Sequence, residues 1–180
     1  MAATSLPTRP AALRRQLAAP SAGVFIGLAT LSLVQAWEWL FSGLTKLQND
    51  AFIKGFQSFV SHAPGPYGRF MTAVVGFFPA LIPRLVEATE LSLGLALLVS
   101  ALAVMVPVSR VRKPGILVAG AASLAGALIA TNLAILVGDR PPWTLSLAPF
   151  GSGVPVEALL AGISIAGVAE AYSAWRISRT

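Results

Sequence analysis

Hydrophobic residues are gathered into four long runs, separated by short segments rich in polar residues, glycine and proline. Each run can supply the roughly 20 helical residues that cross about 30 Å of hydrocarbon. The first run is too long for a signal peptide, and Trp37-Glu38-Trp39 lies where a cleavage site would be expected. The pattern therefore predicts an all-α fold, an integral membrane four-helix bundle. Its predicted spans are about 21–47, 84–106, 115–138 and 154–176.

Basic residues flank these runs at alternate ends. They occur in the N-terminal segment, in the 107–114 connection and at the C-terminus, which all fall on one side of a four-span protein. Because cytoplasmic segments of membrane proteins carry the excess of Lys and Arg, both termini are predicted to be cytoplasmic. The sequence then divides into a cytoplasmic tail, 1–20, and a multi-pass domain of the cell (inner) membrane, 21–176.

The outer segment after the first run, 48–83, has a pattern of its own. Its apolar residues recur at helical spacing after Asn49, which we expect to act as the N-cap of a short amphipathic helix. Ala63-Pro64-Gly65-Pro66 should end that helix. Phe70–Phe78 is apolar but too short to span, and is predicted to be interfacial or re-entrant. The bundle should thus have a long, partly helical outer loop.

Composition narrows the class of protein. Charged residues make up 11% and hydrophobic residues 56% of the 180 residues, with a mean hydropathy of +0.76. A soluble domain carries about 25% charged residues, so a soluble enzyme is excluded. The net charge of +6 comes from residues at the ends of apolar runs, which argues for membrane orientation and not for nucleic acid.

Histidine and cysteine are nearly absent. The chain has no Cys and one His, His62, so it cannot by itself hold an Fe–S cluster, a bis-histidine haem or a multi-histidine metal site. No metal ligands are predicted. Any redox reaction must use an organic carrier or a cofactor held by a partner.

Polar residues inside the spans are costly in hydrocarbon and are the strongest functional signal. Glu38 lies nine residues before Leu47, about 14 Å below the outer end of the first helix. Glu87 and Glu90 open the second helix, Asn132 lies in the outer half of the third, and Glu157 opens the fourth. The first helix carries six polar residues that should share one stripe and face a polar layer open to the outer side: Ser32, Gln35, Glu38, Ser42, Thr45 and Lys46.

Several of these residues have a structural alternative. Glu87 and Glu90 could oppose the helix dipole or pair with Arg84 or Lys46, and Asn132 could hydrogen-bond between helices. Glu38 is harder to explain structurally, since a carboxyl at that depth needs a partner or a proton. The candidate catalytic residues are Glu38, Lys46 and Glu90, and the candidate cofactor-binding residues are Trp37, Trp39, Glu87 and Asn132.

Two stretches resemble the DoxX/DoxD family of small four-helix membrane proteins. Trp39–Leu47 is similar to the family's aromatic–small–Gly–x–x–Lys ending of helix 1, and Glu90–Leu98 to its Glu–x–x–x–Gly–Leu opening of helix 2. The resemblance implies a membrane subunit of a redox system, as in thiosulfate:quinone oxidoreductase, with an extracytoplasmic partner subunit and membrane quinone as electron acceptor. It carries over Lys46 and Glu90; Glu38 comes from the depth argument alone.

Two functions remain open at this point. In the first, the chain is a quinone-reactive subunit: Lys46 donates a hydrogen bond to one quinone carbonyl, Glu38 or Glu90 supplies a proton to the other, and Trp37 or Trp39 stacks on the ring. In the second, the bundle is a non-catalytic anchor or accessory subunit packed in a larger respiratory or photosynthetic complex. A transporter is disfavoured because four spans leave no room for paired inverted repeats.

Overall fold

The computed structural model describes residues 20–63, 65–137 and 156–179, and all regular structure in these ranges is helical. Four helices are long: α2 (Pro20–Leu47), α5 (Leu81–Met105), α6 (Ser109–Val137) and α7 (Val156–Ile177). Two are short, α3 (Phe52–Ser61) and α4 (Gly65–Phe77). The predicted all-α fold is confirmed; the tail before residue 20 and the second outer loop lie outside the described residues.

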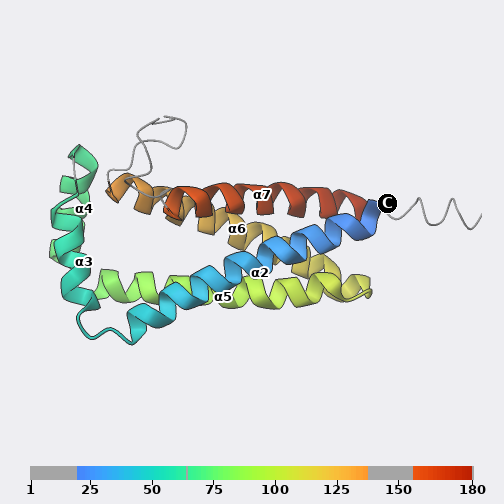
Figure 1. The fold of residues 1–180 in the computed structure, drawn as a ribbon, viewed down its shortest axis with the longest axis horizontal. Helices are drawn as coiled ribbons and strands as arrows, with labels where there is room; N and C mark the ends of the chain where they lie inside the picture. Colours follow the sequence, from blue (N-terminus) through green and yellow to red (C-terminus); the bar gives the residue numbers. More distant parts are fainter. Residues whose placement is uncertain (1–19, 64, 138–155, 180) are drawn as a thin grey trace, which may run out of the picture.

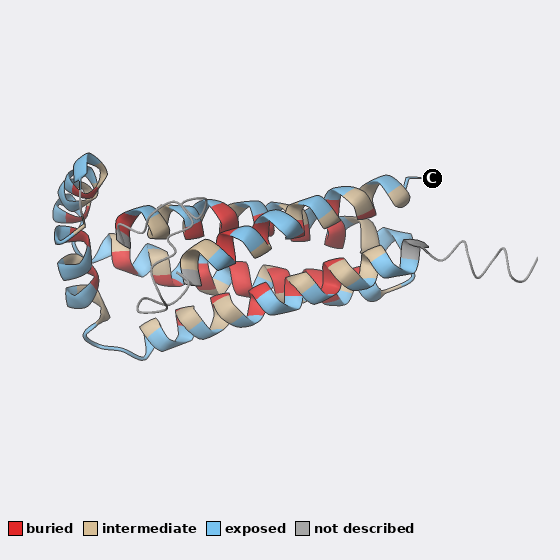
Figure 2. Cartoon of the chain, turned by 45° about the horizontal axis from the view of Figure 1, so that its top comes forward, coloured by how far each residue is buried: buried red, intermediate tan, exposed pale blue. Residues whose placement is uncertain are grey.

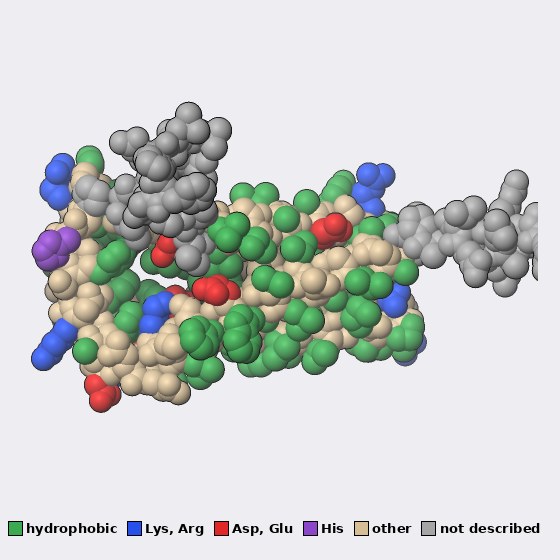
Figure 3. Space-filling model, in the orientation of Figure 1, with side chains coloured by type: hydrophobic (Ala, Val, Ile, Leu, Met, Phe, Trp, Pro, Cys, Tyr) green, Lys and Arg blue, Asp and Glu red, His purple; other side chains and the backbone are tan. Residues whose placement is uncertain are grey.

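The four long helices are long and apolar enough to cross a membrane. They contain 28, 25, 29 and 22 residues, and at 1.5 Å per residue even the shortest extends about 33 Å, which exceeds the hydrocarbon thickness. Large hydrophobic side chains lie exposed along their outer faces and cover most of the middle of the molecule (Figure 3). In lipid, such faces need no protein cover, so the chain is a multi-pass membrane protein by the length and composition of its helices.

The long helices lie side by side, with each neighbour running in the opposite direction (Figure 1). α2 packs against α5 and α7, and α6 packs against the same two helices. The start of α2 and the end of α7 consequently lie at one end of the molecule, together with the α5–α6 connection (Figure 1). Buried residues follow the inward faces of all four (Figure 2).

Glycine sets the distance between α2 and α5. A Cβ on Gly94 would lie 2.8 Å from the backbone N of Leu40, and one on Gly43 would lie 2.8 Å from Leu91 Cγ. Each of these glycines therefore packs directly against a leucine of the facing helix. Close helix pairs in membranes commonly pack through small residues in this way. The small residues of α6, including Ala119, Ser123 and Ala130, are likewise buried, as their spacing predicts.

α3 and α4 form a hairpin that lies across the other end of the long helices (Figure 1). Its small core joins Phe56, Val60 and Val75. The hairpin is tied to α6 by a hydrogen bond between the Asn132 side-chain amide and the Tyr67 hydroxyl. It is also tied to the start of α5 by Gln57, whose amide donates to the backbone carbonyl of Pro79 at 2.8 Å.

The structure corrects two expectations for this loop. The amphipathic helix exists, but it begins at Phe52 after Ala51, without a side-chain cap. Asn49 instead accepts a hydrogen bond from the backbone N–H of Ala51, so its oxygen serves the turn before the helix. Most of the segment predicted as 70–78 belongs to the longer α4, which begins at Gly65, within the predicted break, and ends at Phe77.

The third span starts earlier than predicted. α6 begins at Ser109 and contains Pro114, so the basic residues Arg110, Arg112 and Lys113 belong to its first turns and not to a loop. The backbone N–H groups of Val111 and Arg112 both bond to the carbonyl of Val108, which starts the helix. Pro114 is the sixth residue of α6, beyond the first turn in which proline is tolerated, so it removes one backbone hydrogen bond inside the helix and favours a bend there.

Candidate functional site

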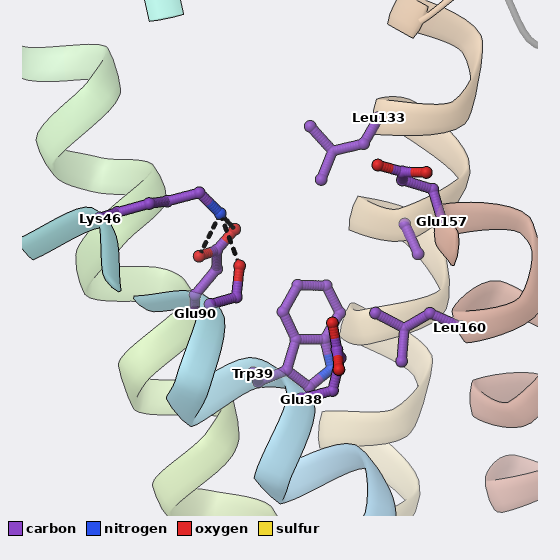
Figure 4. A pocket seen from close by; sticks show the side chains of 9 residues that line it. Glu38, Trp39, Lys46, Glu90, Leu133, Glu157 and Leu160 are labelled. Carbon is purple, nitrogen blue, oxygen red and sulfur yellow. Dashed lines mark hydrogen bonds and ion pairs between the residues drawn. The ribbon is translucent and has the colours of Figure 1, made fainter. Parts of the chain in front are cut away.

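A cavity of about 90 Å³ lies between the four long helices, in the half next to the α3–α4 hairpin (Figure 4). One water molecule needs about 10–15 Å³ of such space, so the cavity has room for several waters or a small ring. Every long helix contributes to its wall. We call it the carboxylate cavity, and its lining consists of Glu38, Trp39, Ser42, Lys46, Glu90, Ala130, Leu133, Glu157 and Leu160.

The strongest polar contact of the cavity joins α2 to α5. Lys46 Nζ lies 2.5 and 2.6 Å from the two carboxylate oxygens of Glu90, and 2.7 Å from Ser42 Oγ. Glu90 is 1% exposed and Lys46 25%. All three N–H donors of the ammonium group are therefore occupied, and the ammonium also lies 5.9 Å from the centre of the Phe52 ring. The ion pair is thus fixed from three sides.

Ser42 gains a specific role from this geometry. Its oxygen accepts from Lys46, which leaves its own O–H free to donate toward the cavity. A group that bonded directly to Lys46 would first have to displace Ser42 or Glu90. The sequence assigned Lys46 itself as the donor, whereas the structure makes Ser42 the available donor beside it.

Two further carboxylates, carried by two different helices, line the same space. Glu38 on α2 and Glu157 at the start of α7 both line the cavity (Figure 4). Neither forms a hydrogen bond or an ion pair within the part of the chain that the structure describes. Figure 4 shows Trp39 between Glu38 and the Lys46–Glu90 pair. Within the described residues, no group of three or more His, Cys, Asp or Glu is arranged to hold a metal ion.

A buried polar layer lies among α2, α6 and α7, on the side of Trp39 that is farther from the α3–α4 hairpin. It consists of Ser32, Gln35 and the indole N–H of Trp39, with Ser123 and Ser164, and all five residues are at most 2% exposed. The amide of Gln35 donates to Ser123 Oγ at 3.3 Å. Ser32 Oγ, Gln35 Oε1, Trp39 Nε1 and Ser164 Oγ have no protein partner. Buried polar atoms in hydrocarbon are rarely left unsatisfied, so this layer is suited to hold water or part of a ligand.

Glycines make the room for this layer. A Cβ on Gly126 would lie 3.1 Å from Trp39 Nε1 and 3.4 Å from Ser164 Oγ. A Cβ on Gly167 would lie 2.6 Å from Ser123 Oγ and 2.8 Å from Gln35 Nε2. Beyond the layer, toward the chain ends, the interior is closed by an apolar cluster that contains Leu28, Val104 and Ile116. The polar layer therefore lies between this apolar cluster and the carboxylate cavity, with which it shares Trp39.

The structure brings four of the seven candidate residues together at the cavity: Glu38, Trp39, Lys46 and Glu90. The other three candidate residues do not line the cavity. Trp37 is 72% exposed and stacks on Phe41 outside the helices, because it lies 100° around α2 from Glu38. Glu87 pairs with Arg84 at 2.7 Å, and Asn132 bonds to Tyr67, as the structural alternatives anticipated.

The polar stripe of α2 is also narrower than predicted. Thr45 is exposed and donates to the carbonyls of Phe41 and Ser42, so it satisfies its hydroxyl on its own helix. Glu157 and Ser42 were visible in the sequence as polar residues near the outer ends, but were not assigned to the site. Ser123 and Ser164 carried no signal except their place among small residues.

The two stretches that resemble the DoxX/DoxD family pack against each other. Lys46 pairs with Glu90, Gly43 receives Leu91, and Gly94 receives Leu40. The three contacts run in antiparallel order, as one continuous α2–α5 interface. No family model, curated protein or solved structure matches the chain. The family resemblance therefore stays a prediction.

Proposed function

We propose that the chain is a membrane subunit of a redox system that binds the headgroup of a membrane quinone in the carboxylate cavity. The observation that carries the proposal is the convergence of a buried ion pair, two carboxylates without described partners and a buried tryptophan on one cavity. A quinone site needs an apolar cleft with hydrogen-bond donors for the two carbonyls and a source of protons. The cavity offers each of these from this chain's own residues.

One donor is Ser42, whose hydroxyl is oriented by Lys46. The indole N–H of Trp39 is a second donor without a partner among the described residues; it belongs to the buried polar layer beside Gly126 and Ser164, so it serves a group that reaches from the cavity into that layer. Lys46 keeps a positive charge close to the carbonyl that Ser42 binds, which favours the negative charge that develops during reduction. In this arrangement Lys46 acts through Ser42, and Glu90 holds Lys46 in place.

The protons come from Glu38 and Glu157. Reduction of a quinone to a quinol takes two electrons and two protons. This chain has no cysteine and one histidine, so we assign the electrons to a cofactor of a partner oxidoreductase or of a sulfur-compound-oxidising subunit. The two carboxyl groups line the cavity from α2 and α7, where each can serve one quinone oxygen and exchange protons with water at the hairpin end.

The charge distribution supports an orientation with both termini in the cytoplasm of a bacterial-type inner membrane. In the half that holds the start of α2, five described cations, Arg110, Arg112, Lys113, Arg176 and Arg179, outnumber the single described acidic residue, Glu170, which lies beside Gly27. At the hairpin end, four described cations face five acidic residues. By the positive-inside rule, the first end is cytoplasmic and the carboxylate cavity opens on the outer side.

The proposal is tested by turnover of the native assembly in isolated membranes. Glu38→Gln should lower quinone reduction at least about 100-fold, the usual contribution of a positioned acid, while the assembly stays intact. Ser42→Ala should lower it as well. Thr45→Ala, on the same helix turn but exposed, is the matched control and should be neutral. Full turnover in both Glu38→Gln and Ser42→Ala would contradict the site.

A non-catalytic anchoring role is the second candidate, and one observation favours it. The hairpin end exposes large aromatic side chains outside the long helices: Phe70, Phe77 and Phe78 are 61%, 80% and 54% exposed. Such side chains suit contact with lipid or with another subunit of a respiratory or photosynthetic complex. Stoichiometric co-purification with cofactor-bearing subunits, together with full turnover of the cavity variants, would establish this role instead.

A further inference from the structure

A second and larger cavity, of about 210 Å³, lies at the opposite end of the long helices. It is formed where α2, the start of α6 and the end of α7 meet. Its walls include the apolar side chains of Phe25 and Ile177 and the polar side chains of Ser109, Arg112, Lys113 and Ser178. We call it the basic pocket. It is separated from the carboxylate cavity by the apolar cluster around Leu28 and Ile116.

Arg112 is held in a fixed position at this pocket. Its Nε donates to the backbone carbonyls of Val104 and Val106, each at 3.1 Å. Its guanidinium carbon lies 4.5 Å from the centre of the Phe25 ring, which is a close cation–π contact. The four N–H donors on its two terminal nitrogens have no partner among the described residues. A guanidinium that is oriented in advance in this way suits a bidentate contact with a phosphate.

Within the described residues, no acidic side chain of the pocket wall balances its positive charge. Lys113 has no ion-pair partner in the described ranges, and no acidic residue lines the pocket. Arg110, Arg176 and Arg179 lie at the same end, and the acidic residue nearest along α7 is Glu170, more than two turns before Ser178. Since a structural ion pair does not use these charges, an anionic ligand is the partner that this site lacks.

We propose that the basic pocket binds the phosphate group of an anionic phospholipid. The pocket lies at the membrane-surface end of helices that are long enough to span, so lipid headgroups are present at its mouth. Exposed apolar side chains next to it give the acyl chains a surface, including Ile26, Met105 and Val108 at 53%, 52% and 51% exposure. Basic pockets between transmembrane helices are typical sites for anionic headgroups. The site is independent of the proposed quinone function.

The test measures lipid retained by the purified full-length chain in native mass spectrometry. Phosphatidylglycerol should be retained, and phosphatidylcholine, which has the same phosphate but no net charge, should not. Arg112→Gln and Lys113→Gln should each weaken retention about five-fold or more. Lys113→Gln breaks no described contact, so its loss of binding cannot come from misfolding of the Arg112 contacts. Arg69→Gln, an exposed cation on α4, is the matched control and should leave retention unchanged.

A competition arm separates the lipid from free phosphate. Inorganic phosphate at millimolar concentration should fail to displace phosphatidylglycerol, because it lacks the acyl chains that contact the apolar surface. Displacement by inorganic phosphate would overturn the lipid assignment. Equal retention of phosphatidylcholine, or unchanged retention in both pocket variants, would overturn the site.

Discussion

Removal of the Lys46 charge is the perturbation for which the structure gives the clearest magnitude. In Lys46→Met, the side-chain length is kept but Glu90, 1% exposed, loses the group that contacts both of its oxygens. An unpaired buried charge costs about 3–5 kcal/mol. Because Lys46 is itself 25% exposed and water can reach its position, the cost should lie near the lower limit, about 3 kcal/mol.

The reciprocal change should cost less. Glu90→Gln leaves an ammonium group that is partly exposed and still bonded to Ser42, so we expect a loss of about 1.5 kcal/mol, the lower limit for a hydrogen bond to a charged group. We therefore expect Lys46→Met to lower the free energy of unfolding more than Glu90→Gln does. Lys46→Met combined with Glu90→Leu should recover much of the stability lost in Lys46→Met, because no buried charge remains.

The assay is thermal and SDS-induced unfolding of the purified protein in detergent, followed by intrinsic fluorescence. For a chain of this size about 3 kcal/mol corresponds to about 6–12 °C in Tm. Lys54→Met, an exposed lysine on α3, is the matched control and should change the free energy of unfolding by less than about 0.5 kcal/mol. Equal effects of Lys46→Met and Lys54→Met, or a larger effect of Glu90→Gln than of Lys46→Met, would refute this reasoning.

Two further predictions concern packing and orientation. Gly94→Ala should destabilise the protein by about 1–3 kcal/mol, because its Cβ would lie 2.8 Å from the backbone of Leu40, whereas Gly162→Ala, with open space around it, should be nearly neutral in the same unfolding assay. Since the chain contains no cysteine, single introduced cysteines report its orientation. An impermeant maleimide added to intact spheroplasts should label Ser58→Cys. It should label Arg179→Cys only after the membrane has been permeabilised. The reverse labelling pattern would invert the proposed topology.

The sequence was sufficient for the four long helices, because they depend on local pattern, and it offered the Lys46–Glu90 pair as one of several structural alternatives. Apolar runs of membrane-spanning length predict the four long helices. Lys46 near the end of α2 and Glu90 in the first half of α5 are brought to similar depths by an antiparallel pairing of these helices. Glu38 follows from the 3.6-residue period, which places it near Lys46 on one face of α2.

The rest depended on tertiary packing. Trp37 and Trp39 are two positions apart, and the rotation of α2 about its axis decides which of them faces inward. That rotation is set by the contacts of Gly43 and Gly94 with leucines of the facing helix, which single-sequence periodicity does not reveal. Glu157 joins the cavity because α7 closes the ring between α2 and α6. Ser123 and Ser164 can join the buried polar layer because Gly126 and Gly167 have no side chains to fill the space beside them.

Single-tryptophan quenching measures whether a quinone headgroup occupies the carboxylate cavity. One full-length variant retains only Trp39, in the cavity, and a second retains only Trp37, 72% exposed on the outside of the same helix. Both are placed in lipid nanodiscs and titrated with a short-chain quinone. We expect quinone to quench Trp39 in a saturable way. Ser42→Ala should weaken the apparent affinity of that quenching about five-fold or more. Trp37 should show only weak, non-saturating quenching by quinone dissolved in the lipid. Equal, non-saturating quenching of both tryptophans would contradict the proposed site.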